Sequence, residues 1–335
     1  MKKLLQLFAM ISLIVLVACG SNDASGEDKE KGDSGSDGDK SYTVGATQIV
    51  EHPSLDEAYK GFKDALSDAG LDVEYKFESA QNDQNNVKPI SDGFVTDGVD
   101  LIFANSTPSA IGALQATSDI PIIFTSVTDA VDAGLVKSMD EPGDNITGVV
   151  DLHPDAIKET VKFIDDNFPD SKIGMIYNAG EQNSVAQIDA VKKAADGTGL
   201  SIIERTVANS SEVQQAATTL VGDADVFYII TDNTVVSALD SVVGVANDQD
   251  IPLFVGEPDS LEKGGFATFG IDYHTIGYRS GEMAADILTG EKKASDFPVE
   301  YPPEIQLFIN KQAAEEQGVK WNDEWDDTAE FVEAE

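Results

Sequence analysis

Residues 101–114 read LIFANSTPSAIGAL, and this stretch decides the fold. The apolar run 101–104 predicts a short buried strand, which the polar turn from Asn105 to Thr107 ends. Thr107 suits an N-cap and Pro108 the first helical position, so a helix should follow the strand directly. A strand that passes through a polar turn into a helix is the repeating unit of a parallel α/β sheet.

The same unit recurs along the chain. Other short apolar runs predict strands at 43–47, 73–77, 120–124, 172–177, 201–205, 226–230, 252–255 and 266–270. Between them, Ser54-Leu55-Asp56-Glu57 reads as a capping box that opens a helix ending before Gly70. Further helix starts are expected at Ser184 and at Ser211, and apolar stripes predict helices over 235–243 and 276–288.

Nine strands suit two sheets better than one wide sheet. The segment 145–152 reads as a crossing between sheets, 271–273 as a second crossing, and the chain after Pro302-Pro303 as a third. We therefore expect an N-terminal lobe of 41–150 plus 273–301, and a C-terminal lobe of 151–272 plus 302–335 that ends in an acidic surface tail over 321–335. The predicted fold is α/β, with two doubly wound Rossmann-like lobes joined by a multi-strand hinge into a clamshell.

Ligands of open parallel sheets bind beyond the carboxyl ends of the strands, so polar residues that follow strands are the candidates for a site. In this chain they are Gln48, Glu51, Ser106, Thr107, Ser126, Thr128, Asp129, Tyr177, Asn183, Ser184, Asp232, Asn233, Glu257 and Asp272. Ser106 and Thr107 would hold a carboxylate, and Asp272 or Asp232 would accept from an ammonium group, which together complement a zwitterion. Each of these residues could instead only cap a helix.

Several longer segments resemble one family. They are TQIVEHP (47–53), TPSA (107–110), VTD (127–129), AGLV (133–136), YN, GE and NS between 177 and 184, NSSEVQQAA (209–217), TDNTVVS (231–237), and GIDY with GEMAA between 270 and 285. They are similar to ABC-transporter substrate-binding proteins of the tryptophan/tyrosine-binding type. The resemblance covers about 43–310 and implies a type I periplasmic-binding-protein fold, an aromatic amino acid as ligand, and delivery to a membrane permease with its ATPase.

The N-terminal residues resemble a secretory signal. Lys2 and Lys3 precede an uncharged run that ends in Leu16-Val17-Ala18-Cys19, which is typical of a secretory signal. This end resembles the lipobox of bacterial lipoproteins, and the resemblance implies that a signal peptide over 1–18 is removed and that Cys19 is lipidated. Residues 19–40 contain almost only Gly, Ser and charged residues, which predicts a disordered linker to the membrane. We therefore expect the protein on the extracytoplasmic face.

Charge and motifs exclude other classes of protein. The chain is strongly acidic, with 61 Asp and Glu residues against 22 Lys and Arg. A negatively charged surface repels nucleic acid and anionic lipid, which disfavours both as partners. The sequence lacks a nucleophile elbow, a phosphate loop and an HExxH motif, and its three histidines are scattered, so we expect no enzyme, metal or cofactor. A monomer is expected. The open alternatives are a sensory clamshell for a membrane receptor and a ligand that is not an amino acid.

Overall fold

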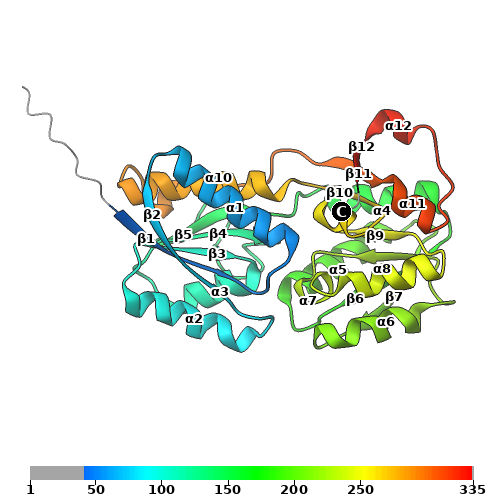
Figure 1. Ribbon diagram of the computed structural model, residues 1–335, viewed down its shortest axis with the longest axis horizontal. Coiled ribbons are helices and arrows are strands. Elements are labelled where there is room, and N and C mark those ends of the chain that lie inside the picture. The colour runs from blue at the N-terminus through cyan, green and yellow to red at the C-terminus, as the bar shows by residue number, and fades with distance from the viewer. Residues whose placement is uncertain (1–40, 334–335) are drawn as a thin grey trace, which may run out of the picture. The chain divides into compact units, whose positions relative to one another are not determined.

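The computed structural model describes residues 41–333, which form two lobes within one compact unit (Figure 1). Each lobe is a β-sheet covered by helices, which confirms the predicted α/β class with two doubly wound lobes. The proposed signal peptide, Cys19 and the linker 19–40 lie outside the described residues.

The first lobe contains a parallel sheet of five strands in the order β2-β1-β3-β4-β5. The strands are β1 (Ser41–Gln48), β2 (Asp72–Ser79), β3 (Leu101–Asn105), β4 (Ile122–Val127) and β5 (Ile146–Val150). β3, β4 and β5 are buried along their whole length, as parallel strands covered on both faces should be.

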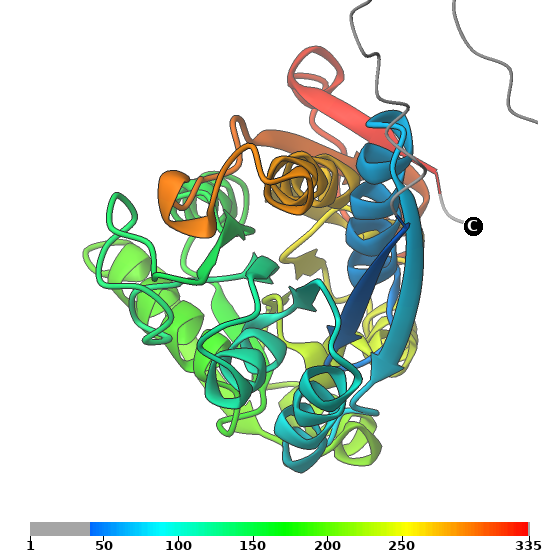
Figure 2. The same ribbon diagram turned by 90° about the vertical axis from the view of Figure 1, so that its left-hand side faces the viewer.

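Helices cover both faces of this sheet (Figure 2). α1 (Pro53–Asp68) and α10 (Tyr273–Thr289) lie on one face, and α2 (Gln84–Asp97) and α3 (Thr107–Ala116) on the other. α1 and α10 pack closely because Gly277 of α10 lies directly against the backbone of α1. A Cβ atom at this position would lie 1.9 Å from the carbonyl oxygen of Ala58. The chain therefore returns from the second lobe to complete the first.

The second lobe contains seven strands in the order β12-β11-β10-β9-β8-β6-β7. They are β6 (Lys172–Tyr177), β7 (Ser201–Thr206), β8 (Val226–Ile229), β9 (Leu253–Val255), β10 (Ala267–Gly270), β11 (Gln306–Asn310) and β12 (Ala329–Val332). β10 and β11 pair antiparallel, and the other neighbouring pairs are parallel.

Two apolar clusters lie on the faces of this second sheet. α4 (Ala156–Asn167) and α5 (Gln182–Ala195) contribute to one cluster, and α6 (Val213–Leu220) and α8 (Leu239–Asp248) to the other. The shorter helices of the chain are η1 (Ser210–Glu212), α7 (Asn233–Val236), α9 (Asp259–Glu262), η2 (Ala294–Asp296), α11 (Lys311–Glu316) and α12 (Trp325–Thr328).

Three crossings connect the lobes: one after β5, one between β10 and α10, and one between Glu300 and β11. Two of them begin side by side, because the amide of Val150 donates to the carbonyl oxygen of Glu300 at 2.9 Å. The crossings leave the carboxyl ends of the first sheet's strands facing the second lobe.

Three strands were not predicted. β5 lies in the segment 145–152 that was read as a crossing, whereas its five residues are buried and paired with β4. β11 and β12 follow the two prolines at 302–303 and close the second sheet. The surface tail predicted over 321–335 contains the paired strand β12, and Trp325 is 4% exposed and packs on Phe163, so the described part of this segment belongs to the second lobe.

Helix starts differ from the prediction by one to three residues. α1 has its N-cap at His52 with Pro53 in the first turn, so Ser54 does not cap it. α3 is capped by Ser106, whose oxygen accepts from the amide of Ser109, and Thr107 lies inside the helix. α5 begins at Gln182, before Ser184. Asp272, predicted on a hinge strand, caps α10 instead.

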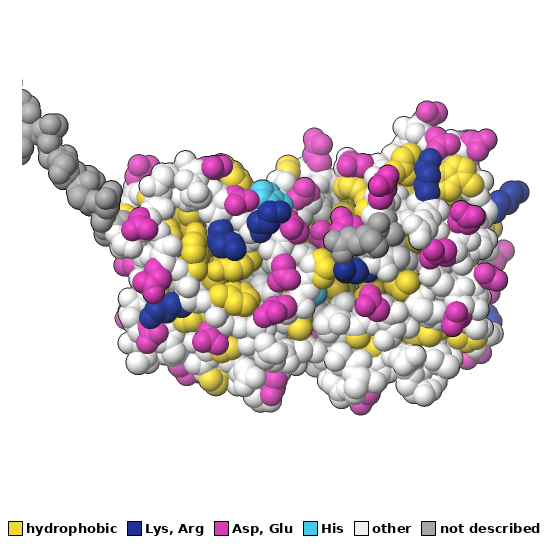
Figure 3. All heavy atoms as spheres, in the orientation of Figure 1, with side chains coloured by type: hydrophobic (Ala, Val, Ile, Leu, Met, Phe, Trp, Pro, Cys, Tyr) yellow, Lys and Arg dark blue, Asp and Glu magenta, His cyan; other side chains and the backbone are white. Residues whose placement is uncertain are grey.

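The acidic excess lies on the surface. Asp and Glu side chains are spread over the face shown in Figure 3, with few Lys and Arg between them. Most ion pairs of the described residues are exposed, such as Lys88 with Asp92, and contribute at most about 1 kcal/mol each. The fold is therefore held by its apolar clusters.

Candidate functional site

A small cavity of about 10 Å³ lies between the two lobes of this closed form. This space is far below the range for small-molecule sites, so the lobes must move apart to admit a ligand. Its wall is formed by His52, Leu55, Ser126, Thr128, Asp151, Asn183, Thr231, Asn233, Val236, Glu257 and Tyr273. The first four belong to the first lobe, Asp151 to the crossing after β5, Tyr273 to the start of α10, and the rest to the second lobe.

The sheets position this wall. His52 follows β1, Ser126 and Thr128 lie at the end of β4, and Asp151 directly follows β5. In the second lobe, Thr231 follows β8, and Glu257 follows β9. The cavity thus lies where the carboxyl ends of both parallel sheets face each other, as expected for open α/β sheets.

Three buried polar atoms on this wall have no hydrogen-bond partner within residues 41–333: Asp151 Oδ1, Asn183 Oδ1 and His52 Nδ1, each able to accept a hydrogen bond. A buried polar atom left unpaired costs about 1–3 kcal/mol, so three around one cavity require a reason. The reason that fits is a ligand rich in N–H or O–H donors.

Asp151 carries the charge of the cavity. Its Oδ2 accepts a 2.8 Å hydrogen bond from the hydroxyl of Tyr273, which is itself buried. Burial raises the pKa of the Asp151 carboxyl to about 6, against the lowering effect of that hydrogen bond. At neutral pH Asp151 is therefore ionised, with one oxygen fixed by Tyr273 and the other free for a ligand.

The other ionisable groups on the wall are neutral at pH 7. Burial, followed by the nearby Asp259 carboxylate, raises the pKa of Glu257 to about 8. Its carboxyl accepts from the amide of Ser260 at 2.7 Å and contacts the Ser260 hydroxyl. Burial lowers the pKa of His52 to about 4. The cavity thus presents a single negative charge.

Asp232 and Glu181 organise the second lobe's wall from behind. Asp232 Oδ1 accepts from the amide of Val235 at 2.8 Å, and Oδ2 from the amide of Asn178 and the hydroxyl of Ser184, both at 2.6 Å. Glu181 Oε2 accepts from the side chain of Asn233 at 2.6 Å. Burial, then the Glu181 charge, raises the pKa of Asp232 to about 7. These hydrogen bonds fix α7, which carries Asn233 and Val236.

Direct hydrogen bonds close the cleft. Asn82 Nδ2 donates to Thr234 Oγ1 at 3.2 Å, and Gln84 Nε2 donates to the carbonyl oxygen of Gly180 at 2.9 Å. Gln187 Nε2 lies 3.2 Å from Thr128 Oγ1 and 2.7 Å from Thr231 Oγ1, so it joins two wall residues of different lobes. The lobes are therefore in a closed arrangement.

The structure brings five of the fourteen predicted residues to the cavity wall: Ser126, Thr128, Asn183, Asn233 and Glu257. Four of the others are buried behind it and hydrogen-bonded within their own lobe: Gln48, Ser106, Thr107 and Ser184.

The remaining five lie elsewhere. Glu51 and Asp129 are exposed, and Tyr177 donates to Glu204 at 3.0 Å. The two predicted ammonium acceptors have other tasks, because Asp232 caps α7 with both oxygens engaged, and the exposed Asp272 accepts from the amide of Thr275. Neither borders the cavity.

Six wall residues are not among the fourteen candidates: His52, Leu55, Asp151, Thr231, Val236 and Tyr273. The rule of polar residues after strands covers Asp151 once β5 is known to end at Val150. His52 and Thr231 were recognised as residues that follow strands, but they were left out of the fourteen. Leu55, Val236 and Tyr273 belong to helices, where nothing in the sequence separates a wall residue from a core residue.

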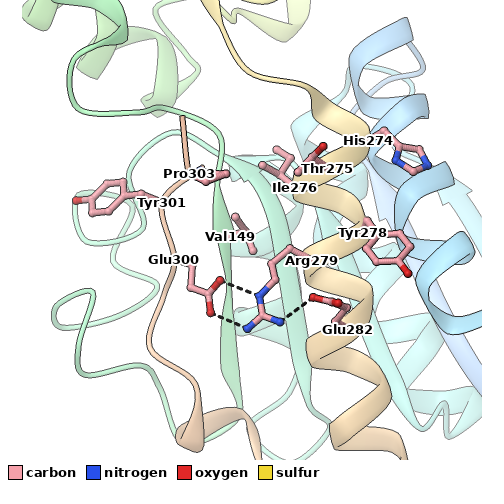
Figure 4. A pocket seen from close by; sticks show the side chains of 10 residues that line it. All are labelled: Val149, His274, Thr275, Ile276, Tyr278, Arg279, Glu282, Glu300, Tyr301 and Pro303. Atoms are coloured by element: carbon pink, nitrogen blue, oxygen red, sulfur yellow. Dashed lines mark hydrogen bonds and ion pairs between the residues drawn. The ribbon is translucent and has the colours of Figure 1, made fainter. Parts of the chain in front are cut away.

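A second, larger pocket of about 360 Å³ lies beside the crossings, between α10, β5 and the segment 300–303 (Figure 4). Arg279 lies at its centre and makes two 2.8 Å hydrogen bonds to Glu300 and one to Glu282. His274 pairs with Asp64 at 2.9 Å, and Tyr278 donates to Asp68 at 3.1 Å. We call this the hinge pocket.

Among residues 41–333 no group of three or more His, Cys, Asp and Glu is arranged to hold a metal ion. The same residues contain no helix that is long and apolar enough to span a membrane.

Two α/β lobes that close on a cavity between them define a solute-binding protein of the clamshell type. The profile of the family described as ABC transporter substrate binding protein matches residues 43–332. The chain belongs to this family. The match extends past the region of the predicted resemblance and includes β11 and β12.

Individual proteins similar to this chain agree with the family assignment. A protein from Clostridioides difficile named tyrosine-binding protein is 42% identical over 317 residues, which are 92% of this chain and 90% of the relative. A Streptococcus pneumonia ABC domain solved in complex with L-Trp has a TM-score of 0.82 at 32% identity and covers 88% of this chain and 100% of its own. A ligand-free, open substrate-binding protein with adhesive properties from Clostridium difficile has a TM-score of 0.64 at 37% identity, over 88% of this chain and 100% of its own.

The last two likenesses bear on conformation. The open, ligand-free structure is closer in sequence but superposes less well than the L-Trp complex. Sequence divergence therefore does not explain the lower score, whereas a different arrangement of the lobes does. This agrees with the hydrogen bonds that close the cleft here.

Proposed function

We propose that the protein captures an amino acid between its lobes and delivers it to the permease of an ABC importer. The observation that carries the proposal is the set of three unpartnered acceptors around one cavity. An α-ammonium group donates N–H hydrogen bonds and accepts none, and its charge matches the single negative charge of Asp151, which leaves a further acceptor on the wall for a donor elsewhere on the ligand. A sugar would offer hydroxyl donors but nothing to balance that charge.

Donors for the ligand's carboxylate are also on the wall. Thr128 Oγ1 and Thr231 Oγ1 both accept from Gln187 Nε2, so each hydroxyl hydrogen is free to donate. Ser126 is less suited, because its hydroxyl donates to Asn105 Oδ1 at 2.7 Å. Thr128 and Thr231 thus replace Ser106 and Thr107 as the proposed carboxylate ligands, and Asp151 replaces Asp232 and Asp272 as the ammonium acceptor.

The relatives support an aromatic side chain. One is named for tyrosine, and another was solved with L-Trp. In this chain Leu55 and Val236 give the cavity an apolar part from both lobes, which suits such a side chain. Contacts from both lobes to one ligand favour the closed form, and the closed body is what a permease would recognise.

A thermal-shift panel tests this proposal. The twenty amino acids, several sugars and several nucleosides are added to the purified protein, and we expect aromatic amino acids to raise its melting temperature. Ligand at 100 times its Kd stabilises by about 2.7 kcal/mol. If only solutes without an α-ammonium group raise the melting temperature, the proposal is wrong.

We further propose that Cys19 is lipidated and holds the protein at the extracytoplasmic face of the membrane near its permease and ATPase. The lipobox-like end Leu16-Val17-Ala18-Cys19 supports this. In the native host Cys19→Ser should move the protein from the membrane fraction to the soluble fraction. A variant that stays with the membrane would contradict the anchor and leave the binding proposal untouched.

A further inference from the structure

His52 is held at the cavity by its backbone, which leaves its ring free for another task. The residue is the N-cap of α1, where its carbonyl oxygen accepts from the amide of Asp56 at 3.0 Å. Its side chain makes no capping hydrogen bond. Pro53 at the first helical position fixes the chain directly after it, so the ring is presented to the cavity from a rigid helix start.

The protonation state of the ring follows from its partner. Asn233 of the second lobe uses its NH₂ group to donate to Glu181 Oε2, which leaves Asn233 Oδ1 to accept from His52. The ring is neutral because burial lowers its pKa to about 4. Nδ1 is buried and has no hydrogen-bond partner among residues 41–333, so a neutral ring that carries its proton on Nε2 presents Nδ1 as an acceptor. A buried acceptor thus borders the cavity.

This acceptor lies in the apolar part of the wall. Leu55 follows His52 by three residues in α1, and Val236 follows Asn233 by three residues in α7, so each pair shares a helix face. The charged Asp151 belongs to the crossing after β5 instead, and its partner Tyr273 to the start of α10. The cavity therefore has a charged part and an apolar part, and the apolar part contains one neutral acceptor.

We propose that His52 Nδ1 accepts a hydrogen bond from the ligand's side chain, so that the site selects amino acids whose apolar side chain carries an O–H or N–H donor. This inference rests on the proposed function and refines it. Tyrosine, with its hydroxyl, and tryptophan, with its indole N–H, meet the requirement, whereas phenylalanine does not. His52 is then a specificity-determining residue.

The selection follows from the cost of an unpaired group. Phenylalanine would fill the same space as tyrosine and leave Nδ1 buried without a donor. A site that hydrogen-bonds a ligand's hydroxyl strongly rejects the analogue that lacks this hydroxyl. We expect the whole protein to bind L-tyrosine at least about tenfold more tightly than L-phenylalanine, measured by isothermal titration calorimetry.

Two variants separate this role from a structural one. In His52→Asn the amide oxygen can take the place of Nδ1, whereas the contact with Asn233 is lost. In His52→Gln the longer amide can reach Asn233, but no acceptor remains at the Nδ1 position. We expect the tyrosine-to-phenylalanine ratio to persist in His52→Asn and to fall to within about threefold of unity in His52→Gln.

The outcomes are distinct. If the native protein binds both amino acids within about threefold, or if His52→Gln keeps the native ratio, the inference is wrong while the proposed function stands. If no amino acid binds the native protein, both are wrong. If both variants fail to fold, the tyrosine-to-phenylalanine ratio of the native protein still decides the matter, because it needs no substitution.

Discussion

The interlobe cavity and the hinge pocket differ in how their polar groups are satisfied. The hinge pocket is larger, about 360 Å³ against about 10 Å³, and Arg279 on its wall pairs with both Glu282 and Glu300. The interlobe cavity is smaller, yet three acceptor atoms on its wall lack partners. Size alone would select the wrong site, whereas unsatisfied hydrogen-bonding capacity selects the one that requires a ligand.

The two regions also differ in what their charges can do. In the hinge pocket the bidentate pair between Arg279 and Glu300 ties α10 to the third crossing, and the Arg279 side chain is 39% exposed. In the cavity the charge of Asp151 is buried and only half paired. The first is a structural ion pair, and the second is ready for a cationic group. Substitutions in the two regions should therefore have separate effects.

The largest effect should come from Asp151→Asn, which removes the charge of the cavity and keeps its shape. Losing one partner of a buried charge pair costs about 2–5 kcal/mol, so affinity for the amino acid should fall at least about 30-fold in calorimetry. The matched control is Glu300→Gln in the hinge pocket, which should bind within about threefold of the native protein. Equal losses in both variants would erase the distinction between the two regions.

The pH dependence of stability should follow the cavity acids. A carboxyl whose pKa is higher in the folded protein than in the unfolded chain binds more protons when folded, so stability falls as pH rises through that range. For Glu257 the range runs from about 4.5 to about 8. In Glu257→Gln the loss of stability between pH 6 and pH 8 should shrink by up to about 2 kcal/mol.

Thermal melts of the ligand-free protein across this range measure that effect. Glu282→Gln, the same change in the hinge pocket, serves as the control and should keep the native slope. A Glu257→Gln variant with an unchanged slope would mean that this carboxyl is ionised in the folded protein at neutral pH.

Gln84→Ala tests closure without touching the wall. The side chain makes one hydrogen bond from the first lobe to Gly180 of the second, so its loss should destabilise only the closed form. One such bond contributes about 0.5–1.5 kcal/mol, and ligand release should accelerate about two- to tenfold in stopped-flow measurements. The melting temperature without ligand should stay nearly constant. An unchanged release rate would show that this contact does not hold the closed form.

The smallest effect should come from Arg279→Met. The ion pair is partly exposed, so its loss should reduce the free energy of unfolding by at most about 1 kcal/mol in denaturant titrations. Affinity for the amino acid should not change. A loss of affinity comparable to that of Asp151→Asn would make the hinge pocket part of the binding mechanism.

Much of the fold could be predicted from the sequence, because short apolar runs indicate the buried strands and apolar stripes with helical spacing indicate the helices between them. The stretch 101–114 formed the expected strand, turn and helix. β11 was not predicted, since two prolines precede it and it joins the sheet antiparallel to β10. β5 was read as a crossing although it is an ordinary buried strand.

That misreading of β5 also concealed the key residue of the site. Asp151 follows the last residue of β5, where the rule for ligand residues applies, but no strand end was expected there. Asp232 and Asp272 were at the right kind of position, yet their oxygens serve backbone amides at helix starts. The sequence places polar residues at strand ends but does not show which of them other groups already satisfy.

The central claim is that the interlobe cavity recognises an α-ammonium group. The most direct measurement compares calorimetric binding of L-tyrosine with that of 3-(4-hydroxyphenyl)propionate, which keeps the ring, hydroxyl and carboxylate and lacks only the ammonium group. We expect the desamino compound to bind at least about 30-fold more weakly, because Asp151 would be left with a buried, unpaired charge. Equal affinity for the two compounds would contradict the account.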